Sequence, residues 1–155
     1  MENDLMKEAL NSVAAYCAAA ERCRSDIFKR LEKWELSSDA EQAIITRLEK
    51  ENFLSESRYA RSYTNDKYKY AKWGKKKIAQ GLYLKKVDSA AIEESLQSID
   101  MNIYLDNLKS VLEAKVKTIK ANTDYEKMGK LVRFALGRGF EYSDITKVLP
   151  GADEF

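Results

Sequence analysis

Histidine is absent from this 155-residue chain, and cysteine occurs only twice. The missing histidine removes the commonest general base and metal ligand, and two cysteines cannot supply the four ligands of a structural zinc site. The sequence also has no glycine-rich phosphate loop and no nucleophile motif. Adjacent carboxylates such as Glu93 and Glu94 are more typical of a solvated helix face than of a catalytic pair. We therefore expect a protein that is not an enzyme and that needs no cofactor or metal.

Proline and glycine are also scarce, with one proline, Pro150, and six glycines. Few residues therefore interrupt helices, while Ala, Leu, Lys and Glu, which favour helices, are abundant. No segment shows the regular alternation of apolar and polar residues that indicates a half-buried strand. The composition predicts an all-α protein.

Long apolar runs are missing as well. None approaches the roughly 18 to 20 residues that span a bilayer, and Glu2 and Asp4 lie where a signal peptide would be basic. We expect a cytoplasmic protein that does not contact a membrane. Cys17 and Cys23 have small apolar neighbours, so we expect free thiols in the core rather than a disulfide.

The chain does contain one helical pattern three times: a longer helix, a second helix with two apolar residues four positions apart, a tight turn, and a closing helix. The apolar pairs of the second helix are Ile27 with Leu31, Ile78 with Leu82, and Val132 with Leu136. The apolar turn residues are Leu36, Val87 and Phe140, and the closing helices carry Ile44 with Leu48, Ile92 with Leu96, and Ile145 with Leu149.

The pattern predicts three tandem three-helix repeats of helix-turn-helix type, forming an elongated curved array. Their predicted bounds are 1–52, 53–100 and 101–150, followed by a frayed C-terminal tail over 151–155. Helix start signals agree with this division. Ser38 and Thr123 are each followed three residues later by Glu, as in a capping box, and Ser55 lies between apolar residues that can form a staple.

Charge is distributed unevenly along the chain, and the net charge of +2 hides the contrast. Residues 58–86 carry ten Lys or Arg and one acidic residue, a net charge of +9, whereas 1–57 sum to −4 and 87–155 to −3. A basic middle between acidic ends attracts polyanions, above all nucleic acid or an assembly built on it. We expect the basic middle to bind a partner.

Within this basic stretch, residues 73–78 (WGKKKI) predict a helix start, with Gly74 as the N-cap and a hydrophobic staple across it. Three lysines in the first turn oppose the positive end of the helix dipole. At the same place in the first repeat, Ser25 is the predicted cap with Asp26 behind it. Lysines and free N–H groups together favour a bound phosphate or carboxylate, and a merely solvated lysine face is the alternative.

The candidate residues follow from this stretch. Tyr59, Tyr63 and Trp73 lie where side chains are expected to pack, whereas Tyr68, Tyr70 and Tyr83 are expected at the surface beside lysines. The residues predicted to bind the partner or nucleic acid are Arg58, Lys67, Lys69, Tyr70, Lys72, Lys75, Lys76, Lys77 and Lys85. The residues predicted to serve the fold are Trp73, Gly74, Ile78, Leu82, Gly139 and Phe140.

With these residues assembled, the chain resembles the RecX family, bacterial regulators of the RecA recombinase. The resemblance covers about residues 9–149 and depends on the order and spacing of several weak motifs. These are Ala9-Leu10 through Tyr16-Cys17, Arg22 to Leu31, Phe53-Leu54-Ser55-Glu56-Ser57-Arg58-Tyr59-Ala60, Trp73-Gly74 with Ile78 and Leu82, and Arg138-Gly139-Phe140.

The resemblance implies three tandem three-helix repeats, no catalysis, and binding along the helical groove of a RecA filament on DNA. Such binding suppresses strand exchange and coprotease activity, and so affects recombination, DNA repair and the SOS response. The resemblance also implies weaker direct binding to single- or double-stranded DNA, and we expect a monomer. Arg58 matches the arginine of the family's Arg-aromatic-Ala motif, and Trp73 with Gly74 matches its Trp-Gly.

The chain departs from the family in two turns. Glu35 and Lys86 stand where the family usually has glycine after the second helix, and only the third repeat keeps it, as Gly139. Glycine at this place is expected to adopt positive φ, so the first two turns are expected to be strained or differently built.

Our leading interpretation is thus a RecX-like protein that binds recombinase filaments and inhibits the recombinase. The second is an autonomous DNA-binding regulator of helix-turn-helix type. Its recognition helix would need base-reading Arg, Asn or Gln, and the closing helices here, with Glu93, Glu94 and Asp144, are poor candidates. A helical scaffold for another protein is the third interpretation, and a metal-free enzyme is a remote fourth.

Overall fold

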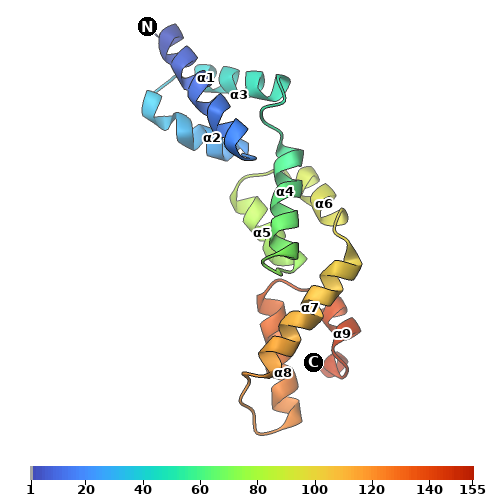
Figure 1. Cartoon of the computed structure of the whole chain (residues 1–155). Coiled ribbons are helices and arrows are strands. Elements are labelled where there is room, and N and C mark those ends of the chain that lie inside the picture. Colours follow the sequence, from blue (N-terminus) through green and yellow to red (C-terminus); the bar gives the residue numbers. More distant parts are fainter. Residues whose placement is uncertain (1) are drawn as a thin grey trace. The chain divides into compact units, whose positions relative to one another are not determined.

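The computed structural model describes residues 2–155, and this part of the chain forms nine α-helices and two short 3-10 helices, with no strand. They follow one another in three groups of three α-helices (Figure 1). The predicted all-α fold of three-helix repeats is confirmed. The elements are α1 (Glu2–Ala19), α2 (Arg24–Leu31), η1 (Glu32–Trp34), α3 (Ser38–Lys50), α4 (Glu56–Lys69), α5 (Lys75–Leu84), α6 (Ser89–Gln97), α7 (Met101–Val116), α8 (Asp124–Gly137), α9 (Tyr142–Val148) and η2 (Ala152–Glu154).

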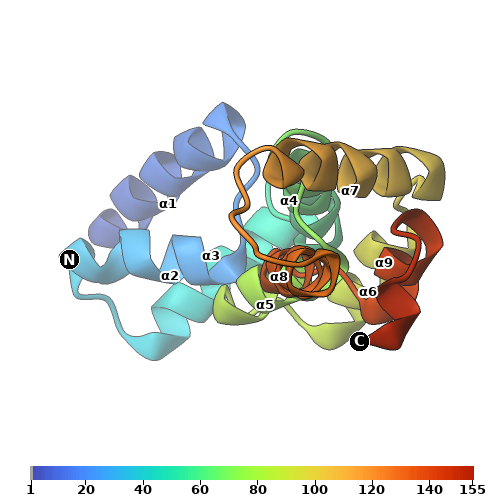
Figure 2. The same cartoon turned by 90° about the horizontal axis from the view of Figure 1, so that it is seen from below.

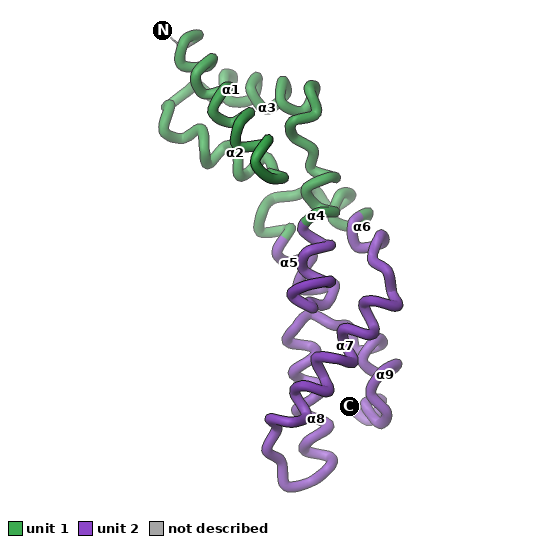
Figure 3. Tube along the Cα trace, viewed as in Figure 1, with its two compact units in different colours: residues 1–62, 82–94 green, residues 63–81, 95–155 purple. Residues whose placement is uncertain are grey.

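The chain divides into two compact units (Figure 3). Unit 1 comprises residues 1–62 and 82–94, and unit 2 comprises residues 63–81 and 95–155. The division lies within α4, α5 and α6, so each unit contains one complete three-helix group and part of the middle one. The repeat boundaries inferred from the sequence remain predictions.

In unit 1, α1, α2 and α3 pack on one another. The predicted apolar pairs, Ile27 with Leu31 and Ile44 with Leu48, are at most 2% exposed. Burying one such side chain stabilises a fold by about 1.5–3 kcal/mol, so these pairs account for much of the unit's stability. The buried cluster contains Ala9, Val13, Cys17, Ile27, Leu31, Ile44, Ile45, Leu48 and Leu54.

The two cysteines belong to the interior, as predicted. Cys17 and Cys23 are buried, free thiols. Burial raises the pKa of both thiols, because the charged thiolate loses its hydration.

In unit 2, α7, α8 and α9 pack on one another, and Figure 2 shows α8 nearly end-on with α7 and α9 around it. Of the apolar pair predicted on α8, Val132 is buried at 4% exposed, but Leu136 is 42% exposed. Leu131 and Ala135, each one position earlier, are also buried, at 3% and 0%. The turn fixes the position of Ala135, because the N–H of Phe140 donates to the carbonyl of Ala135 at 3.1 Å, and the middle repeat makes the equivalent hydrogen bond.

Each of the three turns after the second helices contains one residue with positive φ. Glu35, Lys86 and Gly139 have φ of 50°, 61° and 94°. The left-handed region costs a residue with a Cβ about 1–2 kcal/mol, so the strain predicted for the first two turns is present.

Two predicted helix caps are wrong by position. Ser37, not Ser38, caps α3, with its side chain accepting from the N–H of Ala40. Cys23, not Ser25, is the N-cap residue of α2. The other two predictions are confirmed, because Thr123 accepts from the N–H of Glu126 and Ser55 from that of Arg58.

The C-terminal tail was predicted to be frayed, but the structure shows it to be ordered. Residues Ala152–Glu154 form η2, and Ala152 is fully buried. The Tyr142 hydroxyl donates to the carbonyl of Ala152 at 2.6 Å, and the rings of Tyr125 and Phe155 lie 4.6 Å apart. These contacts hold the last residues against α8 and α9. In the part of the chain that the structure describes, no helix has the length and apolar content needed to cross a membrane.

Candidate nucleic-acid interface

The predicted binding residues divide between the two units. Unit 1 contains Arg58 and Lys85, and unit 2 contains the other seven. Six of the seven are Lys67, Lys69, Lys72, Lys75, Lys76 and Lys77, which we call the lysine cluster, and the last is Tyr70.

Helix α5 begins at Lys75, so Lys75, Lys76 and Lys77 form its first turn, as predicted. Two of their backbone N–H groups are already engaged within the protein, however. The N–H of Lys75 donates to the Tyr104 hydroxyl at 2.8 Å, and that of Lys76 donates to the Gly139 carbonyl at 3.0 Å. These two N–H groups are therefore not available to a phosphate or carboxylate, and anion binding at this helix start stays a prediction that depends on the lysine side chains.

Two motifs that lie far apart in the sequence meet at this helix start. The N–H of Gly74 donates to the Arg138 carbonyl at 2.8 Å. A Cβ on Gly74 would lie 2.1 Å from the carbonyl carbon of Gly139 and 2.1 Å from the nitrogen of Phe140. Only glycine allows the two backbones to approach so closely. Trp-Gly and Arg-Gly-Phe are thus two sides of one contact, which Gly74, Gly139 and Phe140 form.

Tyr104 and Phe140 complete this contact from the core side, with ring centroids 5.2 Å apart. Tyr104 is 1% exposed and Phe140 is fully buried. Burial raises the pKa of the Tyr104 hydroxyl, so that it stays neutral and accepts from the helix start. Sequence reasoning missed Tyr104, because nothing in its local sequence points to a residue 29 positions earlier.

The side chains of the lysine cluster have no acidic partner. Within residues 2–155, none of the six takes part in an ion pair. The Nζ atoms of Lys67 and Lys77 lie 4.6 Å and 4.5 Å from the ring centroid of Trp73. Trp73 is only half-buried, so it packs as predicted on one side and supports two ammonium groups. The cluster is a concentration of positive charge that no carboxylate neutralises.

The other members are placed in different ways. Lys69 and Lys76 are exposed. Lys72 has φ of 55°, and its Nζ lies 3.1 Å from the hydroxyl oxygen of Ser110. The Nζ of Lys75 lies 5.7 Å from the ring centroid of Tyr104.

The surface tyrosines were predicted correctly in two cases of three. Tyr70 and Tyr83 are 80% and 73% exposed, whereas Tyr68 is only 3% exposed. The buried Tyr68 accepts two hydrogen bonds: its carbonyl accepts from the side-chain amide of Asn107 at 2.7 Å, and its hydroxyl accepts from the N–H of Asp100 at 3.5 Å. These contacts tie α4 to the start of α7.

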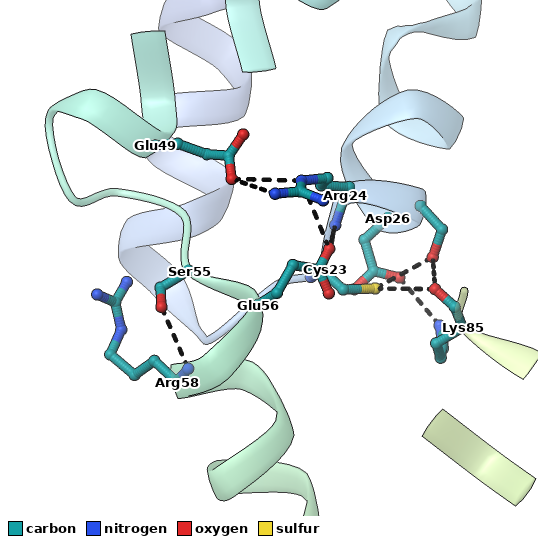
Figure 4. Close-up of polar contacts among 9 residues, drawn as sticks. Cys23, Arg24, Asp26, Glu49, Ser55, Glu56, Arg58 and Lys85 are labelled. Carbon is teal, nitrogen blue, oxygen red and sulfur yellow. Dashed lines mark hydrogen bonds and ion pairs between the residues drawn. The ribbon is translucent and has the colours of Figure 1, made fainter. Parts of the chain in front are cut away.

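Arg58 and Lys85 differ from the cluster, because both are engaged within unit 1. Arg58 forms an ion pair with Glu21, and its guanidinium donates to the carbonyl of Asn52 at 3.1 Å. The ammonium of Lys85 lies 2.9 Å from a carboxylate oxygen of Asp26 (Figure 4). Burial acts to raise the pKa of Asp26, but the hydrogen bonds from Lys85 and Cys23 outweigh it and lower that pKa. The two residues serve the fold of unit 1, and their predicted role in binding remains a prediction.

The start of α2 in unit 1 makes a contact like that at the start of α5 in unit 2, but with different side chains. The N–H of Arg24, the first residue of α2, donates to a carboxylate oxygen of Glu56 at 2.9 Å, and Glu49 pairs with the Arg24 guanidinium at 2.7 Å (Figure 4). The Ser25 hydroxyl donates to the carbonyl of Lys85 at 2.7 Å. In both units, the first residue of a second helix therefore donates its N–H to the first helix of the next repeat, and the turn of that repeat accepts a further hydrogen bond from the same helix start.

The capping carboxylate is almost fully enclosed. Glu56 is 7% exposed, and its second oxygen has no hydrogen-bond partner within the described chain. Burial raises the pKa of Glu56, and the neighbouring Arg24 only partly offsets this effect.

Unit 1 also contains basic residues that sequence reasoning missed. The guanidinium carbons of Arg22 and Arg30 lie 3.7 Å and 4.6 Å from the ring centroid of Tyr16. Residues 1–57 sum to −4, and that sum concealed the local group. The adjacent pair Lys29 and Arg30 in the last turn of α2 was the signal that could have revealed this group.

No group of three or more Cys, Asp or Glu with metal-binding geometry occurs in residues 2–155.

Comparison with known proteins gives matches along most of the chain. The family model of the second three-helix domain of RecX matches residues 55–96, and that of the third matches residues 102–149. The regulatory protein RecX of Finegoldia magna is 29% identical over 132 residues, which cover 84% of this chain and 64% of that protein. The chain thus spans less than two thirds of that relative.

Two further matches agree. The regulatory protein RecX of Clostridium botulinum strain Alaska E43 is 32% identical over 150 residues, covering 86% of this chain and 70% of that protein. The crystal structure of RecX from Lactobacillus salivarius superimposes with a TM-score of 0.88 over 99% of both chains, at 20% identity. At that identity the likeness shows the fold.

Proposed function

The chain belongs to the RecX family, and from that premise we propose that it binds filaments of a RecA-type recombinase on DNA and lowers the recombinase's activity. Its relatives are named regulatory proteins, which supports regulation by binding rather than by catalysis. The proposed setting is recombination and DNA repair in the cytoplasm. The proposed partners are the filament and, more weakly, DNA itself.

The observation that carries the proposal is the lysine cluster. Its six ammonium groups lie within 11 residues, without a carboxylate partner in the described chain. Three of them stand at the positive end of the α5 dipole, where each exposed cation costs a few tenths of a kcal/mol. An arrangement that destabilises the free protein is explained if a polyanion binds there, because Lys contacts to phosphates release condensed counterions.

The neighbouring aromatic residues support binding to single-stranded DNA within the filament. Tyr70 is 80% exposed beside Lys69, so it can stack on an unpaired base. Trp73 holds Lys67 and Lys77 over its ring, which restricts two ammonium groups before binding. Part of the entropy of ordering these side chains is therefore lost already in the free protein.

The first test replaces Lys75, Lys76 and Lys77 by Gln. We expect folding to be unchanged or slightly more stable, since repulsion at the start of α5 is relieved. Affinity for a recombinase filament on single-stranded DNA should fall. The slope of log affinity against log salt should flatten by about 0.7 for each phosphate that the variant no longer neutralises. Binding and salt slope equal to those of the wild type would contradict the proposal.

A matched control keeps the change of net charge the same. Lys109, Lys117 and Lys120 are exposed residues of unit 2 without ion-pair partners in the described chain, and their replacement by Gln removes the same three charges. We expect this control to bind almost as well as the wild type. An equal loss of affinity in both variants would mean that total charge alone, and no particular surface, attracts the filament.

A second readout reports on the cluster directly. The chain has two tryptophans, so Trp34→Phe leaves Trp73 as the sole tryptophan. Bound phosphates should draw the ammonium groups of Lys67 and Lys77 away from the indole ring. The emission of Trp73 should therefore change when DNA or filament is added. Binding by anisotropy without any change in emission would place the contact elsewhere.

A further inference from the structure

We propose that unit 1 contains a second phosphate-binding site, a cavity walled by Tyr16, Lys29, Arg30 and Lys85 that takes a phosphate group of single-stranded nucleic acid. The cavity has a volume of about 330 Å³ and is also lined by Asp26. It contains three cationic side chains and one carboxylate, and the carboxylate is already paired with Lys85 at 2.9 Å. The inference rests on the proposed function, because it assigns that function a second contact with nucleic acid.

The positive charges on the wall of this cavity outnumber the negative ones. Lys29 and Arg30 are exposed, and neither takes part in an ion pair within residues 2–155. Because Lys85 neutralises Asp26, the charges of Lys29 and Arg30 remain, and they give the wall of the cavity a net charge of +2. Positive charges gathered around one cleft bind an anion more tightly than the same charges dispersed over a flat surface.

Tyr16 fixes the geometry of the site. The guanidinium of Arg30 lies over its ring at 4.6 Å, and that of Arg22 lies at 3.7 Å while its Nε donates to the Tyr16 carbonyl at 3.0 Å. A guanidinium held on an aromatic ring loses less conformational entropy when it binds a phosphate bidentately. Arg30 is thus preorganised to bind phosphate, and Arg22 adds a further positive charge at the same ring.

The site continues into a neighbouring cavity. Lys29 also lines a cavity of about 470 Å³ together with two other basic residues, Arg24 and Lys86, and one acidic residue, Glu32. Two adjoining basic cavities that share one lysine suit a flexible chain with a charge on every unit, which describes single-stranded nucleic acid. An acidic protein segment is the competing partner, and the experiment below distinguishes the two.

The experiment measures binding of a fluorescent single-stranded oligonucleotide by anisotropy, at 50 and 200 mM salt and without recombinase. The variant Lys29→Gln/Arg30→Gln no longer neutralises two phosphates, so the salt slope should flatten by about 1.4. The ratio of wild-type to variant affinity should then shrink about 7-fold between the two salt concentrations. The single variant Lys29→Gln, at an exposed residue, should show about half of the change in slope.

The control variant Lys7→Gln/Lys50→Gln removes two exposed charges of unit 1 that line other cavities, and it should bind like the wild type. Melting curves establish that each variant is folded. Unchanged DNA binding by the Lys29/Arg30 variant overturns the inference, as does a wild-type protein that does not bind the oligonucleotide at 50 mM salt.

The recombinase assay separates the two proposals. If the Lys29/Arg30 variant binds DNA normally but no longer binds the recombinase without DNA, the cavity is a protein contact and the inference is wrong. If the wild-type protein binds DNA through the cavity but has no effect on a recombinase filament, the proposed function fails and the site stands.

Discussion

Gly74→Ala is the substitution for which the structure predicts the largest effect. Its Cβ would lie 2.1 Å from the carbonyl carbon of Gly139, whereas ordinary contacts begin near 3.4 Å. The two backbones would have to separate by about 1.3 Å, because neither atom belongs to a side chain that could rotate away. The perturbation therefore acts on the contact between the start of α5 and the turn after α8.

The expected loss of folding stability follows from the contacts that this separation of the two backbones disrupts. Overpacking against rigid atoms costs about 1–3 kcal/mol, and the upper end applies to backbone. The separation also weakens the hydrogen bonds from Gly74 to Arg138 and from Lys76 to Gly139, each worth about 1 kcal/mol. We expect a loss of about 3–5 kcal/mol in the free energy of unfolding. For a chain of this length, that corresponds to a decrease in Tm of about 6–20 °C.

The assay is thermal and urea unfolding followed by circular dichroism, with Gly137→Ala as the control. A Cβ on Gly137 meets nothing within 4 Å, and Gly137 is the last residue of α8. The control should be neutral or stabilising by up to about 1 kcal/mol, because alanine has the higher helix propensity. Equal stability of the two variants would refute the close approach of the two backbones.

Three further predictions concern the turns and the buried carboxylate. Gly139→Val should cost more than about 1 kcal/mol of folding free energy, because φ is 94° and the Cβ would lie 2.4 Å from that of Lys77; wild-type stability in urea would show a different turn. Lys86→Gly should stabilise the protein by up to about 1 kcal/mol, since φ of 61° disfavours lysine; a lower Tm would contradict this. Burial raises the pKa of Glu56, so its protonation favours the folded state. This contribution is fully present below the ordinary glutamate pKa and is lost as pH rises through the raised value. The Tm of wild type minus that of Glu56→Gln should therefore decrease from pH 4 to pH 7, and a constant difference would mean that the pKa is not raised.

Much of the fold followed from local signals. Helical spacing of apolar residues indicated the three groups of helices, and the pairs Ile27 with Leu31 and Ile44 with Leu48 are buried. In the third repeat Val132 is buried as predicted, but Leu136 is exposed and its neighbour Ala135 is buried, because the smaller residue carries the weaker apolar signal. Only the turn hydrogen bond identifies Ala135 as the buried residue.

The site was less predictable, because its important contacts join distant residues. Local sequence indicated the lysines at the start of α5 but not the capping of their N–H groups by Tyr104 and Gly139. Tyr68 has lysines on both sides in the sequence, yet contacts with α7 bury it. Summed charge concealed Arg30, because Asp26 is the one acidic residue of the first repeat among the residues that line its cavity. Sequence patterns locate helix faces, whereas burial and capping depend on what packs against them.

The most direct test of the proposed function is ATP hydrolysis by the cognate RecA-type recombinase on single-stranded DNA, titrated with this protein. We predict inhibition that increases with the ratio of protein to recombinase. It should be weaker with the Lys75→Gln/Lys76→Gln/Lys77→Gln variant and unchanged with the Lys109→Gln/Lys117→Gln/Lys120→Gln control. Undiminished ATP hydrolysis at every ratio of wild-type protein would contradict the proposal that the chain restrains a recombinase filament.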